Sequence, residues 1–201
     1  MYSKITNLVF GFHGCDKSVV ERIIHGEEMK PSNKEYDWLG HGVYFWENDP
    51  QRAYEWALEA SNRKNSSVKE PAVVGTVLDL GHCLDLTNRE SIKMVQVAYQ
   101  VLSEYYEDRK MELPKNENVQ GNKDWVKRYL DCTVIEQIHK GTVEDVFPKF
   151  DSVKCMFTEG NQAYPGSGFR EKTHTQICIV NPNCIKAVFI PREINKNYAI
   201  P

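Results

Sequence analysis

Apolar and polar positions alternate in short blocks near both ends of the chain, whereas the middle carries the longer spacing typical of helices. Blocks rich in β-branched and aromatic residues and bounded by turn-forming residues predict strands. These blocks are residues 5–12, 42–46, 72–80, 83–86, 152–158, 174–180 and 184–190. Because most helical sequence lies between the early and the late strands, we expect an α+β fold whose sheet joins distant parts of the chain.

Four segments repeat apolar residues every three or four positions, which predicts helices. The first ends near residue 25, and the other three span residues 50–62, 89–107 and 124–139. Asp16 or Ser18 fits the N-cap of the first helix, and Asp49 followed by Pro50 fits the start of the second. The charged and polar residues 108–123 are predicted to form a loop.

The length of 201 residues predicts one domain, residues 1–201, with a helical insertion at about 88–140. Hydrophobic and charged contents of 41% and 26% are typical of a globular protein. A net charge of −3 gives no overall attraction to nucleic acid or to an anionic membrane. No apolar run approaches the roughly 18 residues of a membrane span, and the N-terminus lacks the pattern of a secretory signal. We therefore expect a cytoplasmic protein with no membrane partner.

Several common chemistries lack support in the sequence. The six cysteines form no C-x-x-C pair, so we expect free, mostly buried thiols and no metal. A Cys–His nucleophile would need His13 with Cys15 or His82 with Cys83, and neither pair has the context of a cysteine protease. The G-x-G-x-x-G and G-x-x-x-x-G-K-[ST] patterns are also absent, so a Rossmann or P-loop nucleotide site is not expected.

Three short stretches combine polar residues with the ends of predicted strands. They are His13-Gly14-Cys15, Gly40-His41-Gly42-Val43-Tyr44-Phe45 and Thr173-His174-Thr175-Gln176-Ile177-Cys178-Ile179. Glycines at the start of a strand allow an unusual backbone conformation or the close approach of a ligand. Each stretch alone is commonly structural, but the set predicts one site if the sheet brings the three strands together.

In order and spacing, these stretches resemble the motifs of the ADP-ribosyltransferase superfamily, in the branch of diphtheria toxin-like enzymes and poly(ADP-ribose) polymerases. That branch carries a His-Tyr-Glu triad on three strands. His13-Gly14 resembles the first motif, Gly40 to Phe45 resembles the second, and Gln176 stands at the position of the glutamate. The resemblance implies a split mixed or antiparallel sheet with a helical middle segment, and NAD+ as co-substrate.

The resemblance also implies roles in NAD+ binding. Tyr44 would stack on the nicotinamide, whose positive ring is attracted to an aromatic face, and Tyr54 or Trp56 would close the other side. His13 would hydrogen-bond the adenine-side ribose, and the backbone of Gly14 would pair with the carboxamide. The implied NAD+-binding set is His13, Gly14, Cys15, Gly42, Tyr44 and Tyr54.

Two positions depart from the family pattern. The family glutamate binds the ribose 2′-hydroxyl and faces the cationic transition state, whereas Gln176 keeps the hydrogen bond without the charge. Glu159 or Glu171 is expected to supply the missing charge, and Arg52 stands where the polymerases often have a serine. His174 shares a strand face with Gln176 and would contact the acceptor. The implied catalytic set is Gln176, Tyr44, His13 and His174, and we expect transfer of a single ADP-ribose.

The loop before the third motif is expected to meet the acceptor. Its predicted acceptor residues are Glu159, Tyr164, Phe169, Arg170 and Glu171. Aromatic rings stack on bases and cations meet phosphates, so RNA or DNA fits, and a protein acceptor fits equally well. The resemblance and the small size favour a bacterial toxin of a toxin–antitoxin or phage-defence system, with an antitoxin protein as partner.

Two alternatives remain open beside the mono-ADP-ribosyltransferase. An NAD+ glycohydrolase would differ only in using water as acceptor. A catalytically silent module would bind NAD+ or ADP-ribose without turnover, which suits glutamine at position 176.

Overall fold

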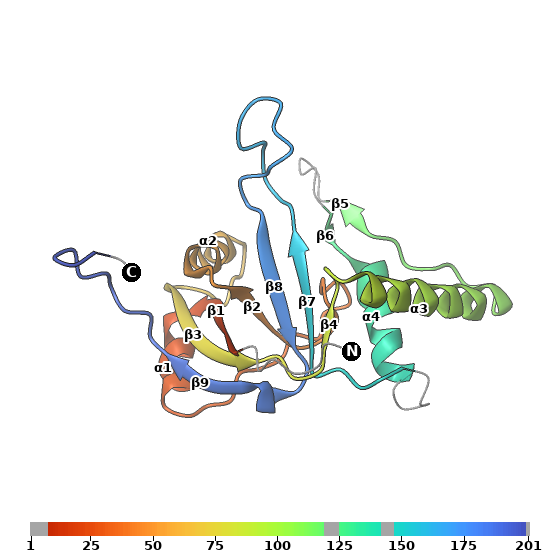
Figure 1. Ribbon diagram of the computed structural model, residues 1–201, viewed down its shortest axis with the longest axis horizontal. Coiled ribbons are helices and arrows are strands. Elements are labelled where there is room, and N and C mark those ends of the chain that lie inside the picture. Colours follow the sequence, from red (N-terminus) through yellow and green to blue (C-terminus); the bar gives the residue numbers. More distant parts are fainter. Residues whose placement is uncertain (1–7, 119–124, 142–146, 200–201) are drawn as a thin grey trace.

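The computed structural model describes residues 8–118, 125–141 and 147–199. Within these ranges the chain forms a mixed seven-stranded sheet with helices packed on it (Figure 1), which confirms the expected α+β class. The sheet strands are β1 (Leu8–Asp16), β2 (Val43–Glu47), β3 (Pro71–Asp79), β4 (Cys83–Asp85), β7 (Ser152–Phe157), β8 (His174–Ile179) and β9 (Ile185–Phe189). Residues 5–7 of the first predicted strand lie outside the described ranges.

The strand order is β4-β7-β8-β2-β1-β3-β9, so strands from opposite ends of the sequence meet in the middle of the sheet. The β4–β7 pair is parallel and the other pairs in this sheet are antiparallel. As a result, β1, β2 and β8, which carry the three motifs, are neighbours. A short 3-10 turn, η1 (Pro182–Cys184), occupies the predicted start of the last strand.

Two capped helices cover the end of the sheet that contains β1 and β3. Helix α1 (Lys17–Ile24) begins after Asp16, whose carboxylate accepts a hydrogen bond from the Ser18 N–H, so Asp16 rather than Ser18 is the N-cap. Helix α2 (Pro50–Ser61) begins after Asp49, which accepts from the Arg52 N–H at 2.8 Å. Both caps fit the predicted helix starts.

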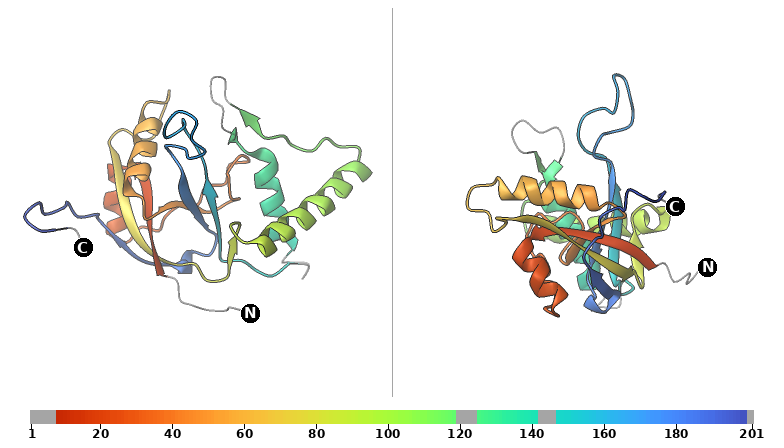
Figure 2. Two further views of the ribbon diagram at one scale, coloured as in Figure 1. Left: turned by 45° about the horizontal axis from the view of Figure 1, so that its top comes forward. Right: turned by 90° about the vertical axis from the view of Figure 1, so that its left-hand side faces the viewer.

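The predicted helical insertion lies between β4 and β7 and packs at the opposite end of the sheet (Figures 1 and 2). It contains α3 (Arg89–Asp108), β5 (Glu117–Asn118), β6 (Trp125–Lys127) and α4 (Tyr129–Gly141). The predicted helix start at residue 124 is wrong, because residues 125–127 pair with β5 instead. Helix α4 begins at residue 129, and the side-chain oxygen of Asn116 accepts hydrogen bonds from the N–H groups of Leu130 and Asp131.

Apolar side chains form separate clusters on the two faces of the sheet. One contains Leu84, Val153 and Cys178 beneath α3 and α4, and another contains Val43, Phe45 and Ile177 on the opposite face. All six cysteines are free, as expected. In the described ranges, no helix combines the length and the apolar character needed to cross a membrane.

Candidate functional site

The sheet brings the three motifs side by side. In the β2–β8 ladder Trp46 lies opposite Gln176, and in the β7–β8 ladder Phe157 lies opposite His174. Residues directly opposite each other point to the same face of a sheet, so these four side chains share one face. On the other side of β2, the ring of His13 hydrogen-bonds the backbone of Tyr44 and lies against Phe45, so His13 points to the opposite face of the sheet from these four side chains.

His13 is a neutral imidazole with a defined tautomer. Burial lowers its pKa and outweighs the opposing effect of its hydrogen bond to the Tyr44 carbonyl. That carbonyl lies 2.8 Å from Nδ1 and can only accept, so Nδ1 carries the proton. Nε2 therefore has a free lone pair, which suits a hydroxyl donor such as a ribose.

Tyr44 is held by both atoms of its hydroxyl group. The oxygen accepts a hydrogen bond from the Leu39 N–H at 2.8 Å, and the O–H donates to the Gly40 carbonyl at 2.6 Å. Burial raises the pKa of Tyr44 well above its usual range. The hydroxyl is thus a structural anchor, and the half-buried ring is the part of Tyr44 that a ligand would meet.

Two motif glycines have structural reasons to lack a side chain. A Cβ on Gly14 would overlap the carbonyl oxygen of Ala53, so glycine lets α2 pack directly on β1. A Cβ on Gly42 would lie 2.5 Å from the Cys178 sulfur. The proposed role of Gly42 in ligand access stays a prediction.

The neighbouring Cys15 points to the other face of the sheet from Gly14. It is buried against Val20, Ile23 and Val74 beneath α1, and burial raises its pKa to about 11. Its side chain is therefore a neutral core thiol, and any contact between Cys15 and a ligand would involve the backbone.

His174 and Gln176 form a hydrogen-bonded pair on β8. His174 Nδ1 donates to the Lys172 carbonyl at 2.7 Å, which leaves Nε2 to accept from the Gln176 amide nitrogen at 3.1 Å. Burial lowers the pKa of His174, in agreement with a neutral ring. Because the amide nitrogen faces His174, the Gln176 oxygen remains available to accept from another group.

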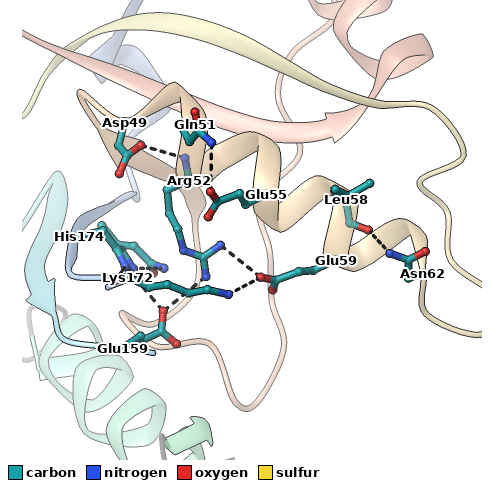
Figure 3. A network of polar contacts seen from close by, with 11 residues as sticks. Asp49, Gln51, Arg52, Glu55, Leu58, Glu59, Asn62, Glu159, Lys172 and His174 are labelled. Carbon is teal, nitrogen blue, oxygen red and sulfur yellow. Dashed lines mark hydrogen bonds and ion pairs between the residues drawn. The ribbon is translucent and has the colours of Figure 1, made fainter. Parts of the chain in front are cut away.

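A network of charged side chains connects this pair to α2 (Figure 3). The Glu159 carboxylate lies 3.6 Å from His174 Nδ1 and 3.5 Å from the Arg52 guanidinium. Arg52 is also 3.9 Å from Glu59, and the Lys172 ammonium binds Glu59 at 2.8 Å. The network contains two cations and two carboxylates, so its formal charges balance.

Hydrogen-bond donors without partners lie beside this network. Arg52 is only 8% exposed, and its Nε and Nη1 atoms are buried without a hydrogen bond, although Nη1 lies 3.9 Å from the Glu59 carboxylate. Trp46 is 4% exposed, and its ring nitrogen is also buried and unpaired. The Arg52 guanidinium lies 5.8 Å from the Trp46 ring centre, so the unpaired donors belong to one cluster. Such groups are costly unless a ligand or water accepts from them.

Trp56, rather than Tyr54, lies at this cluster. The Trp56 and Trp46 rings are 5.8 Å apart, and Trp56 is one helical turn from Arg52. Tyr54 is two positions from Arg52 and therefore lies on another side of α2, where it is about half exposed. The structure does not bring Tyr54 to the Arg52–Trp46 cluster.

The predicted acceptor loop continues the β7–β8 hairpin as an arm that projects from the sheet (Figure 1). Backbone hydrogen bonds join Lys172 to Glu159, Glu171 to Asn161 and Ala163 to Phe169. Tyr164 and Phe169 are exposed on this arm. Glu171 bonds to Asn161, so Glu159 is the loop carboxylate that reaches His174 and Arg52. Arg170 lies opposite Gln162 in an isolated bridge.

The sequence did not assign Trp46 or Glu59 to the site. Trp46 lies on the strand of the second motif and Trp56 on the helix that follows it. Their spacing could have predicted that the two rings meet. The Arg52–Glu159 pair joins residues 107 positions apart, and no local pattern reveals such a contact.

Comparisons with known proteins do not identify a family. No protein-family model matches the chain, and no solved structure matches it. The chain is 24% identical over 191 residues to an uncharacterized protein of Methanocaldococcus jannaschii, in an alignment that covers 87% of this chain and 83% of that protein.

Proposed function

We propose that the protein is an NAD+-dependent mono-ADP-ribosyltransferase whose donor site lies between α2 and the start of β8. The observation that carries the proposal is the cluster of buried, unpaired donors of Arg52 and Trp46 beside the His174–Gln176 pair. The ribose hydroxyls and pyrophosphate oxygens of NAD+ are acceptors that fit such donors. The resemblance of the three motifs to ADP-ribosyltransferases gives independent support.

Each motif has a role in this proposal. The Tyr44 ring faces the nicotinamide, and His13, whose ring lies against Phe45 on the other face of the sheet, holds the Tyr44 backbone in place through its hydrogen bond. The Gln176 oxygen accepts from the 2′-hydroxyl of the nicotinamide ribose. His174 is a positioning residue, because its fixed tautomer sets the orientation of the Gln176 amide.

Glu159 supplies the negative charge that Gln176 lacks. In the transfer, the bond between ribose C1′ and the nicotinamide nitrogen breaks and its electron pair leaves with nicotinamide. A lone pair of the acceptor forms the new bond to C1′, and the acceptor's proton passes to Glu159 or to water. Positive charge that develops on the ribose is stabilised by a carboxylate fixed before the reaction begins.

The silent binding module remains the second candidate, and one observation favours it. Glu159 already interacts with Arg52 and His174, so part of its charge is compensated in the free protein. Binding without turnover would need only the donors of Arg52 and Trp46.

NAD+ labelled on its adenylate half, mixed with the purified protein and a bacterial lysate, tests the proposal. We expect label in a protein, RNA or DNA fraction together with an equal amount of released nicotinamide. Both should be lost in Tyr44→Ala. Free ADP-ribose alone would make the protein a glycohydrolase. NAD+ binding without nicotinamide release would support the silent module.

The proposed cellular role is that of a toxin. Induced expression in bacteria should stop growth, and Tyr44→Ala should relieve the arrest. Unimpaired growth at matched protein levels would contradict the toxin role without affecting the enzymatic proposal.

A further inference from the structure

A pocket of about 660 Å³ lies between the helical insertion and the sheet, outside the donor site described above. Helix α3 supplies one wall, the start of α4 supplies another, and β7 supplies part of the sheet side. Its lining includes Trp38, Gln96, Tyr99, Arg128, Cys155 and Phe157. The volume falls within the range of roughly 300–1,000 Å³ typical of small-molecule sites.

The pocket wall contains a guanidinium packed on aromatic rings. The Arg128 guanidinium carbon lies 4.2 Å from the Trp38 ring centre and 4.7 Å from that of Phe157. The Trp38 ring nitrogen donates to the Val126 carbonyl at 2.9 Å, and Arg128 Nε donates to the Trp125 carbonyl, so both groups are fixed. Fixed aromatic rings and guanidinium planes are the surfaces on which unpaired nucleobases stack.

Polar groups line the opposite side of the same pocket. Gln96 and Gln100 are one turn apart on α3, so both amides face the same way. Each amide offers a donor and an acceptor, the combination that reads the edge of a base. Gln96 and Gln100 are exposed, and Asp131 is held by Asn116 at 2.8 Å and by Arg128 at 3.5 Å.

The pocket touches the donor site through three of its lining residues. Cys155 lies opposite Gln176 in the β7–β8 ladder, and Phe157 lies opposite His174 with ring centres 6.0 Å apart. Leu39 donates its N–H to the Tyr44 hydroxyl. A base held in the pocket would therefore lie on the same face of the sheet as His174 and Gln176, one strand away from them.

We propose that this pocket binds a nucleobase of the acceptor, which makes the acceptor a nucleic acid or a nucleotide. This inference rests on the proposed transferase function. It assigns acceptor recognition to the helical insertion, in addition to the arm between β7 and β8.

Equilibrium dialysis of the four ribonucleosides against the 201-residue chain, in saturating ADP-ribose, tests this inference. ADP-ribose occupies the donor site, so the dialysis reports a separate site. We expect at least one nucleoside to bind saturably, with Tyr99→Ala weakening its binding roughly tenfold, the loss expected for one stacking contact. Tyr105→Ala is the matched control, because Tyr105 is similarly exposed on α3, at 49% against 42% for Tyr99, but does not line the pocket.

Absence of saturable nucleoside binding, or equal affinities in the wild type and in a folded Tyr99→Ala variant, would overturn the inference. A second variant, Gln96→Ala with Gln100→Ala, guards against misfolding at one position and should change the order of preference among the nucleosides. The donor-site proposal is judged separately by NAD+ binding and nicotinamide release without nucleoside. Nicotinamide release without nucleoside binding would reject the base pocket alone.

Discussion

At the scale of single residues, Glu159 and Glu171 lie at opposite ends of one loop in different surroundings. Glu159 contacts His174 and Arg52, whereas Glu171 bonds to Asn161 on the exposed arm. We expect Glu159→Gln to lower the rate of nicotinamide release by about 100- to 1,000-fold, because a fixed group that stabilises transition-state charge contributes about this much.

Glu171→Gln is the matched control, because it makes the same chemical change within the same loop. Its rate of nicotinamide release should remain close to that of the wild type, while Gln176→Ala should reduce the rate more than Glu171→Ala does. Melting temperatures of the variants check whether Arg52, which loses its Glu159 partner in Glu159→Gln, then destabilises the fold. A larger loss in Glu171→Gln than in Glu159→Gln would assign the charge to the other carboxylate.

His13 gives a prediction about stability against pH. Its pKa in the folded protein is below the ordinary value of 6.5, so the unfolded chain takes up a proton first as the pH falls. Above the unfolded pKa neither state is protonated, and below it the unfolded state is favoured. Between pH 7.5 and 5.5 the free energy of unfolding should fall by about 1 kcal/mol less in His13→Gln than in the wild type.

Urea denaturation at the two pH values measures this difference. His139 and His174 also have lowered pKa values, but they contribute to the wild type and the variant alike. His25→Gln, at an exposed position on the C-cap of α1, is the control. Equal pH dependence in the wild type and His13→Gln would show that His13 is not held neutral.

The sequence supported part of the site at this scale. Motif order placed His13, Tyr44 and Gln176 on separate strands, and the sheet brings those strands together. Sequence alone left Glu159 and Glu171 as equal candidates, because the choice depends on a long-range contact with Arg52. The implied NAD+-binding set contained Tyr54 and not Trp56, because the side of α2 that faces the site depends on how the helix packs.

At the scale of elements, Gly14 controls how closely α2 approaches β1. Any side chain at this position would overlap the backbone of Ala53, which cannot move without shifting the whole helix. We expect Gly14→Ala to lower the free energy of unfolding by about 2–3 kcal/mol, at the upper end for overpacking. Urea denaturation measures the loss.

Gly168→Ala provides the control, because a Cβ at Gly168 would meet no atom within 4 Å. Its free energy of unfolding should stay within about 0.5 kcal/mol of the wild type. If Gly14→Ala were equally mild, α2 would not be tightly fixed on the sheet, and the position of Arg52 would have to be reconsidered.

The elements predicted best are those with local signals. Helices α1 and α2 begin after capping aspartates that the sequence displays directly. The start of α4 was misplaced because the apolar spacing continues through residues 125–127, which instead pair with β5. The cap that fixes the true start comes from Asn116, and no pattern around residue 129 could have indicated it.

At the scale of the whole molecule, the sequence predicted the class of the fold but not the order of its strands. A sheet built from distant segments was expected because predicted strands occur at both ends of the chain. The neighbours of each strand depend on packing between the two halves of the sequence. That packing brings together α2, which belongs to the N-terminal half, and β8, which belongs to the C-terminal half, and the proposed donor site lies between them.

A ligand that contacts both halves should stabilise the entire fold. At an NAD+ concentration 100 times its Kd, binding would add about 2.7 kcal/mol to the free energy of unfolding. For a chain of 201 residues this corresponds to a rise in melting temperature of roughly 5–10 °C. Differential scanning fluorimetry over a series of NAD+ concentrations measures the shift.

Arg52→Met tests whether the buried donor cluster produces that stabilisation, because it keeps most of the side-chain volume and removes the charge and the donors. We expect its melting temperature, compared with its own ligand-free value, to rise little with NAD+. Arg63→Met, just beyond the end of the same helix at an exposed position, should respond like the wild type. A full shift in Arg52→Met would move the NAD+ site away from this cluster, and absence of any shift in the wild type at millimolar NAD+ would reject the proposed function itself.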